Sequence, residues 1–393
     1  MPPSPAAAPP AGGRRRVARA AAALALASAV AGGAAARDQV APPEARHAAG
    51  RRAAHGTQRA EVLRSDPLPG MPPLLDAHDV YAADRPGRLS RAVRRFPARV
   101  YVPNGRSDTV VVIDARTYRP VGRFKVGRQP QHVTPSWDLR TLWVGNNQSN
   151  TLTAIDPAKG RPVRTVKVDD PYNLYFTPDG RRAIVVAEAL RHALPVPCEG
   201  VDHLDFSADG RYLLASCEFS GELLQVDVAR EQLVRVVPLR AGAMPQDVKL
   251  APDGSVFYVA DLTGGVWVVD AARPRVLGFV RTGKGAHGLY ASRDARILYV
   301  SNRSDASISL ISFATSKVVA TWRLPGGGSP DMGGVSADGR VLWLSGRYNR
   351  EVYAIDTRNG RLLARIPVGA GPHGLCVYPQ PGRYSLGHTG VFR

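Results

Sequence analysis

The stretch LYVSNRSDASISLIS, residues 298–312, decides the fold of this chain. It contains two apolar runs separated by a polar turn, and within each run apolar side chains alternate with others. Alternation with period two is typical of β-strands, because successive side chains point to opposite faces of a sheet. A similar phrase, YVPNGRSDTVVVID, stands at residues 101–114. The same strand–turn–strand phrase far apart in one chain indicates an internal repeat.

Turns centred on an aspartate mark the period of the repeat. Asp-Gly between alternating apolar runs is a strong hairpin signal, because glycine accepts a positive φ. Successive turns stand 41–44 residues apart, with one interval of 30 residues. The six turn residues are Asp138, Asp179, Asp209, Asp253, Asp294 and Asp338. Four strands in each such interval form the unit of a propeller blade. The sequence therefore predicts an all-β, seven-bladed β-propeller over residues 98–380.

Both ends of the repeat array indicate how the ring closes. The array starts at a second strand, at Val100, and ends with a lone first strand, Pro372 to Tyr378. Pairing the two in one blade would remove the open edges that invite aggregation. The interval of 30 residues, from Asp179 to Asp209, predicts a shortened third blade. We expect it to have three strands, or a loop in place of its third, and an exposed strand edge near residues 190–196.

The N-terminal segment has the layout of an export signal. Arg14, Arg15, Arg16 and Arg19 precede an uncharged, alanine-rich run that ends in Ala34-Ala35-Ala36. This predicts a secretory signal peptide cleaved near Ala36, an extracytoplasmic protein and no stable transmembrane span. Whether export is general or twin-arginine stays open. The expected segments are a signal peptide at 1–36, a disordered tether at 37–60, an extended lead-in at 61–97 and a C-terminal tail at 381–393.

The chain is basic, with a formal net charge of +19 at pH 7. A basic surface attracts polyanions and anionic surfaces. The ordinary interpretation is a solvated surface, so binding of nucleic acid is a third hypothesis rather than the first. We expect a monomer.

The two quoted phrases, together with GAGPHGLCVYPQPG at residues 369–382, resemble the YVTN-repeat β-propeller family of YncE-like and lactonase-like bacterial proteins. The resemblance covers residues 98–380 and implies a propeller fold. It also implies several kinds of function, because members of this family include binding and scaffold proteins, sugar-lactone hydrolases and haem-carrying redox relatives. The sequence has no C-x-x-C-H motif, which argues against a c-type haem.

One polar residue per blade stands just before or at the start of a predicted inner strand. In a propeller these positions gather around one end of the central channel. They are His132, Asn173, His203, Asp247, His287, Asp331 and His373. One interpretation is a ligand-binding ring in which His132, His203, His287 and His373 hold a divalent metal such as Zn, Cu or Fe. The other is turn chemistry, with each histidine bonded to the backbone of its own blade.

The three cysteines fit an oxidising compartment. Cys198 and Cys217 flank His203 on strands that should be neighbours, so a disulfide is the first prediction. A Cys/His metal site and buried free thiols are the alternatives. Cys376 lies on the closing strand and is expected in the core.

Motifs for catalysis are absent from the sequence. It has no G-x-x-x-x-G-K-[ST], no G-x-S-x-G and no H-E-x-x-H, so no catalytic residue is assigned. The sequence favours a non-catalytic exported propeller that binds a small ligand, a metal or a cell-envelope protein through its channel-end loops. The first alternative is a lactonase-like or metal-dependent hydrolase at the same end. The second is a polyanion-binding protein.

Overall fold

The computed structural model describes residues 23–26, 66–187, 194–388 and 390–393. The expected tether, and the expected signal peptide apart from Ala23–Leu26, lie outside these residues. Within these ranges, no helix combines the length and the apolar character that a membrane crossing would need.

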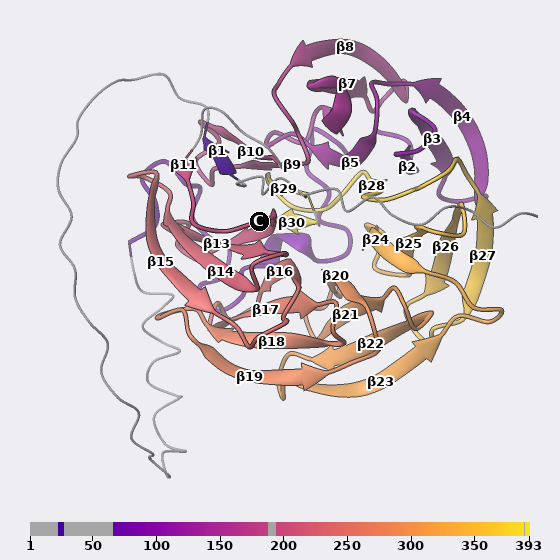
Figure 1. Ribbon diagram of the computed structural model, residues 1–393. Helices are drawn as coiled ribbons and strands as arrows, with labels where there is room; N and C mark the ends of the chain where they lie inside the picture. The colour runs from indigo at the N-terminus through magenta and orange to yellow at the C-terminus, as the bar shows by residue number, and fades with distance from the viewer. Residues whose placement is uncertain (1–22, 27–65, 188–193, 389) are drawn as a thin grey trace, which may run out of the picture.

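Seven antiparallel sheets form a ring around a central channel, which confirms the predicted seven-bladed propeller (Figure 1). The first blade contains β28 (Cys376–Tyr378), β2 (Arg99–Asn104), β3 (Thr109–Asp114) and β4 (Arg119–Lys125). The second contains β5 (Pro130–Pro135), β6 (Leu142–Asn146), β7 (Thr151–Asp156) and β8 (Arg161–Lys167), with the short 3-10 helix η2 (Asn147–Ser149). The third contains β9 (Asn173–Phe176), β10 (Ala183–Ala187), β1 (Ala23–Leu26) and β11 (Leu194–Pro195).

The remaining four blades follow one another along the chain. The fourth contains β12 (Val201–Phe206), β13 (Tyr212–Cys217), β14 (Glu222–Asp227) and β15 (Gln232–Pro238). The fifth contains β16 (Pro245–Leu250), β17 (Val256–Asp261), β18 (Gly265–Asp270) and β19 (Val276–Arg281). The sixth contains β20 (Ala286–Ala291), β21 (Ile297–Asn302), β22 (Ser307–Ser312) and β23 (Lys317–Arg323). The seventh contains β24 (Pro330–Val335), β25 (Val341–Gly346), β26 (Glu351–Asp356) and β27 (Leu362–Pro367).

The aspartate turns work as the sequence predicts. In the fourth blade, Ser207 Oγ donates to Asp209 Oδ1 at 2.6 Å, and the same oxygen accepts the Arg211 backbone N–H at 3.1 Å. Gly210, which follows Asp209, has a φ of 69°, a backbone conformation that residues other than glycine rarely adopt. A hydroxyl, a carboxylate and a glycine therefore set the hairpin locally.

Burial falls from the channel outward. Every residue of the inner strand β12 is buried, whereas the outermost strand β8 is almost wholly exposed. Apolar side chains from adjacent blades pack together, as Val112 of β3 does with Val144 of β6. The core therefore lies between the blades, and each blade depends on its neighbours for burial.

The ring closes in the predicted way. β28 pairs antiparallel with β2, with Tyr101 opposite Cys376 and Arg99 opposite Tyr378. The first blade thus joins the C-terminal inner strand to the first three strands of the array.

The third blade is shortened, and its third position is filled from elsewhere. β1 pairs antiparallel with both β10 and β11, between which it lies. Ala23–Leu26, from the expected export signal, therefore covers the edge of β10 that would otherwise be open. Most of the predicted exposed edge at residues 190–196 lies outside the described residues; β11 is the outermost strand of this blade.

The tail at 381–393 forms a hairpin inside the ring. β29 (Ser385–Gly387) pairs with β30 (Val391–Phe392) and with the inner strand β9. Figure 1 shows both strands near the centre of the propeller. The terminal Arg393 is 1% exposed; its guanidinium lies 3.3 Å from Asp205 Oδ1 and over the Tyr81 ring.

The lead-in packs against the end of the channel that carries the aspartate turns. The Val80 N–H donates to Pro252 O at 2.8 Å, and Tyr81 Oη donates to Leu250 O at 2.7 Å. The short 3-10 helix η1 (Ala82–Asp84) follows. Because Tyr81 also meets Arg393, the lead-in and the tail together close this end of the channel.

Candidate functional site

The seven residues singled out from the sequence all lie at or just before the start of an inner strand, and all are buried. Their strands all begin at the end of the channel opposite to the aspartate turns. Most of them are linked by contacts between blades, through four imidazoles, Asp331 and Asn173. Asp247 lies beside this network, where its Oδ2 accepts the Leu289 backbone N–H at 2.8 Å.

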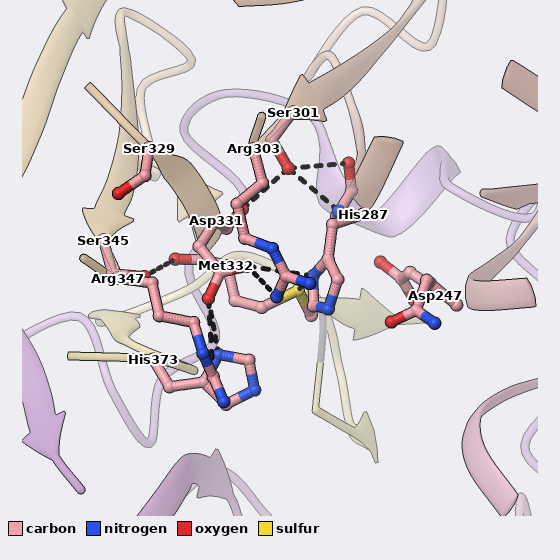
Figure 2. A network of polar contacts seen from close by, with 12 residues as sticks. Asp247, His287, Ser301, Arg303, Ser329, Asp331, Met332, Ser345, Arg347 and His373 are labelled. Atoms are coloured by element: carbon pink, nitrogen blue, oxygen red, sulfur yellow. Dashed lines mark hydrogen bonds and ion pairs between the residues drawn. The ribbon is translucent and has the colours of Figure 1, made fainter. Parts of the chain in front are cut away.

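Asp331 joins two of the histidines. Its Oδ2 lies 2.7 Å from His373 Nδ1, and its Oδ1 lies 3.2 Å from His287 Nδ1 (Figure 2). The guanidinium of Arg303 donates to Oδ1 at 3.2 Å, and Arg347 Nη1 lies 3.6 Å from Oδ2. Burial alone would raise the pKa of Asp331, but the two imidazoles and Arg303 lower it well below its usual value. The carboxylate is therefore ionised.

This ionised carboxylate fixes the tautomers of its partners. A carboxylate accepts only, so Nδ1 of His287 and Nδ1 of His373 carry the proton. The Nε2 atom of each ring is left with a lone pair. For His373, that atom lies 3.4 Å from the Tyr172 hydroxyl. For His287, Nδ1 also lies 2.9 Å from Met332 Sδ. A carboxylate behind Nδ1 is the usual support of a histidine that binds metal through Nε2.

His132 has an unused nitrogen in a fully buried place. Its Nδ1 lies 2.8 Å from Nε2 of His388, which stands at the tip of the tail hairpin. Its Nε2 is buried and has no hydrogen-bond partner in the described part of the chain. Buried polar atoms are nearly always satisfied, so an atom of this kind requires an explanation, such as a bound ion or water.

His203 is engaged within the protein. Its Nδ1 lies 3.0 Å from Asn173 Nδ2 and 3.2 Å from Tyr175 Oη, both of which donate. Nδ1 is then an acceptor, so Nε2 carries the proton; it lies 3.4 Å from Asp202 Oδ1 but makes no hydrogen bond in the described residues. Of the four histidines predicted to bind metal, His203 is thus the one that fits a structural role.

Burial keeps these imidazoles neutral. Desolvation lowers the pKa of His132, His203, His287 and His388 well below the usual value; nearby basic side chains lower it further, whereas Asp331 opposes the shift at His287 and His203. Desolvation and Arg347 lower the pKa of His373 to about 4, although Asp331 opposes them. Neutral imidazole is the form that binds metal.

The spacing of the rings suits a shared ion in part. Imidazoles bound to one ion at about 2.1 Å have ring centres roughly 4.5–6.4 Å apart. The His132 and His373 rings are 4.6 Å apart, and those of His287 and His373 are 5.7 Å apart. Their ligand atoms do not yet meet, since three such atoms come within 4.8 Å in the described residues only at Cys198, Cys217 and Glu222. Closing a metal centre requires the imidazoles to rotate inward.

Cys198 and Cys217 form a disulfide across the fourth blade, with Cα atoms 6.0 Å apart. Their sulfurs are therefore not metal ligands. Cys376 is a buried free thiol, and burial raises its pKa. A high pKa keeps the thiol protonated and unreactive.

Sequence reasoning missed His388, Met332 and the two arginines beside Asp331. One signal could have found the histidine, because LGHTG around His388 resembles GAHG and GPHG around two of the predicted residues. Arg303 and Arg347 follow the second strands of their blades, and no local pattern connects them with Asp331. Only the ring brings them together.

Comparison with known proteins agrees with the fold. The family described as YNCE-like beta-propeller matches residues 88–382. The uncharacterized protein YncE of Salmonella typhi is 28% identical over 161 residues, which are 39% of this chain and 43% of that protein. The match thus spans less than half of that relative.

Two solved structures share the fold. The periplasmic gluconolactonase PpgL of Pseudomonas aeruginosa has 23% identity and a TM-score of 0.60, over 72% of this chain and 99% of that one. The dihydro-heme d1 dehydrogenase NirN in complex with DHE has 18% identity and a TM-score of 0.55, over 86% of this chain and 83% of that one.

Proposed function

Because the chain belongs to the YncE-like β-propeller family, we propose that it is an exported binding propeller that holds a transition-metal ion at the histidine end of its channel. The ligands are His132, His287 and His373, each through Nε2. The observation that carries the proposal is the buried Nε2 of His132, which has no hydrogen-bond partner among the described residues.

The donor set selects the kind of metal. Neutral imidazoles suit zinc, copper, iron and nickel, whereas a thioether favours Cu(I). Met332 is fully buried beside His287, so a sulfur donor stands next to the proposed ligands. Copper and zinc are therefore the ions to test first.

Export is supported by two observations. The Cys198–Cys217 disulfide fits an oxidising compartment, where such bonds persist. PpgL, a structural neighbour, is named as a periplasmic protein.

The test is metal titration of the full chain after treatment with a chelator. We expect one ion to bind per chain, and we expect His132→Ala and His373→Ala to weaken binding at least about tenfold, which is about 1.4 kcal/mol. The matched control is His78→Ala, because His78 is exposed in the lead-in. The proposal fails if the wild type binds no zinc or copper, or if the His78 variant loses as much affinity as the others.

A second candidate is hydrolysis of a lactone, which one contact favours. Asp331 orients His373 so that Nε2 could take a proton from water, as in a carboxylate–histidine pair. Three structural neighbours carry the name of a lactonase: PpgL and two putative 6-phosphogluconolactonases from Bacteroides species. The pKa of about 4 makes His373 a weak base, which is why this candidate stands second. Release of acid from sugar lactones, lost in His373→Ala and retained in His78→Ala, would favour it.

A further inference from the structure

A polar pocket opens at the mouth of the channel, above the histidines. It is a hollow of about 370 Å³, whose lining includes Arg106, Arg128, Arg347, Gln131 and Tyr348. Small-molecule pockets usually measure about 300–1,000 Å³. Gln131 precedes His132 in the chain, and Arg347 reaches Asp331 below, so the pocket adjoins the histidine end of the channel.

The three arginines carry donors that the protein does not use. The Arg106 guanidinium is exposed and makes no hydrogen bond or ion pair among the described residues. Arg128 donates from one guanidinium nitrogen to the Gln148 backbone oxygen, at 3.2 Å. Arg347 Nη1 is buried without a hydrogen bond, although Asp331 lies 3.6 Å away. Guanidinium groups bind carboxylates and phosphates through paired N–H donors.

Arginines outnumber acids in the lining of the pocket. Asp108 lines the pocket, and its Oδ1 accepts the Gln129 backbone N–H at 2.9 Å. Asp331 below is shared between Arg347, Arg303 and two imidazoles. The pocket lining itself therefore has three arginines against one aspartate.

The remaining lining suits a polar organic molecule. Gln129, Gln131 and Gln148 offer amide N–H donors and C=O acceptors, which can form hydrogen bonds with hydroxyl groups. Tyr348 is 63% exposed at the rim and lies under Arg303, 5.8 Å from guanidinium carbon to ring centre. An exposed aromatic ring beside arginines is a surface on which a small ligand can lie.

We infer that this pocket binds a small, hydroxylated organic anion with a carboxylate or phosphate group, held by Arg106, Arg128 and Arg347. The inference goes beyond the proposed metal site and does not rest on it, because the arginines need no metal to bind an anion. A polynucleotide is a different occupant, which the test separates.

The experiment is calorimetric titration of the full chain, stripped of metal by a chelator, with probes of matched shape. The probes are glucose 6-phosphate, citrate and inorganic phosphate, with glucose as the uncharged partner of the first. We expect glucose 6-phosphate or citrate to bind saturably below about 1 mM and glucose not to bind. Inorganic phosphate distinguishes a site that binds only the charged group from a site that also binds the organic part of the ligand.

Two double variants give the matched comparison. Arg106→Gln with Arg128→Gln removes two charges from the pocket and leaves Asp331 untouched; we expect it to weaken anion binding at least about tenfold. Arg296→Gln with Arg340→Gln removes two charges at the aspartate turns, where those side chains are 84% and 80% exposed. This control should bind like the wild type.

Several outcomes would overturn the inference. They are equal weakening in both double variants, binding of glucose as tight as that of its phosphate, no saturable binding of any anion, or binding of an oligonucleotide alone. Metal titration of the pocket variant keeps the two proposals apart. If the pocket variant binds metal like the wild type but no longer binds the anion, the anion pocket is separate from the metal site. If the wild type binds the anion but no metal, the anion pocket stands and the metal proposal fails.

Discussion

Asp331 Oδ2 lies 2.7 Å from His373 Nδ1, and this one contact decides which nitrogen of His373 carries the proton. The other oxygen of the carboxylate does the same for His287. Two blades, the sixth and the seventh, are thus tied through one ionised group to the closing strand of the first.

Changing Asp331 to Asn should therefore weaken metal binding more than it changes the fold. An amide has a single acceptor oxygen and an NH₂ donor group, so it cannot replace both carboxylate oxygens as acceptors for the two imidazoles. Loss of such a supporting carboxylate typically reduces metal affinity about 10–100-fold. Competition with a chromophoric chelator measures the effect. Asp247→Asn is the control, because Asp247 is equally buried on the inner strand of the fifth blade but lies outside the network. Equal affinity in the two variants would contradict the role of Asp331.

The tail hairpin should be required for stability. Arg393 is buried against Asp205, and removing one partner of a buried ion pair leaves an uncompensated charge. Arg393→Gln should lower the free energy of unfolding by about 3 kcal/mol, measured by urea denaturation. The exposed Arg361→Gln is the matched control and should change it little. An unchanged midpoint for Arg393→Gln would mean that the hairpin does not contribute to folding.

The repeat could be predicted from the sequence, whereas the channel contents could not. Alternating strands and the Asp209-Gly210 turn are local signals, so the blades, their order and the closing strand could be read from the chain. The polar residues of the inner strands were also visible, since six of the seven stand six or seven residues before the aspartate of a turn. The hairpin strands β29 and β30 have no strand–turn–strand repeat, and the phrase around His388 does not say where in the ring they pair. The contact between Arg347 and Asp331 depends on side-chain direction, which the pattern does not contain.

Acid should destabilise the protein before it titrates the channel histidines. The buried imidazoles have pKa values below the usual one; they belong to His132, His203, His287, His373 and His388. In the unfolded chain a histidine has a pKa of about 6.5, so the unfolded state binds more protons in a window that opens at about pH 6.5 and, for His373, closes at about pH 4. Stability contributed by these groups is present above that window and is lost as the pH falls through it.

Three carboxyl groups oppose this trend. Burial raises the pKa of Asp84 and of Asp247 to about 7 and also raises the pKa of Glu218, so these groups bind protons in the folded state first. Five imidazoles outweigh three carboxyls, and we expect a lower urea midpoint at about pH 5 than at about pH 7.5. An equal or higher midpoint at about pH 5 would show that the imidazoles are not held neutral.

Reduction of the disulfide should destabilise the fourth blade. The bond closes a loop with a sequence separation of 19 residues, and loops of this size correspond to about 3 kcal/mol in the chain-entropy account. Wild-type protein should therefore melt at a lower temperature in the presence of a reductant. The double variant Cys198→Ser/Cys217→Ser should melt low with or without reductant. A reductant effect that persists in the double variant would implicate another group, and Cys376 would be the first to examine.

Removal of residues 1–36 should expose a strand edge. β1 lies between β10 and β11, and it comes from the segment that we expect export to remove. Without it, β10 presents unpaired backbone groups over Ala183–Ala187, and such an edge can pair with another strand. The chain 37–393 should then self-associate more than the full chain, measured by sedimentation velocity across a range of concentrations. The full chain carrying Val185→Pro tests whether weaker pairing along β10 is enough to cause self-association, because proline removes a backbone donor from β10 while residues 1–36 are still present. If 37–393 stays monomeric and melts like the full chain, β1 contributes nothing to the third blade.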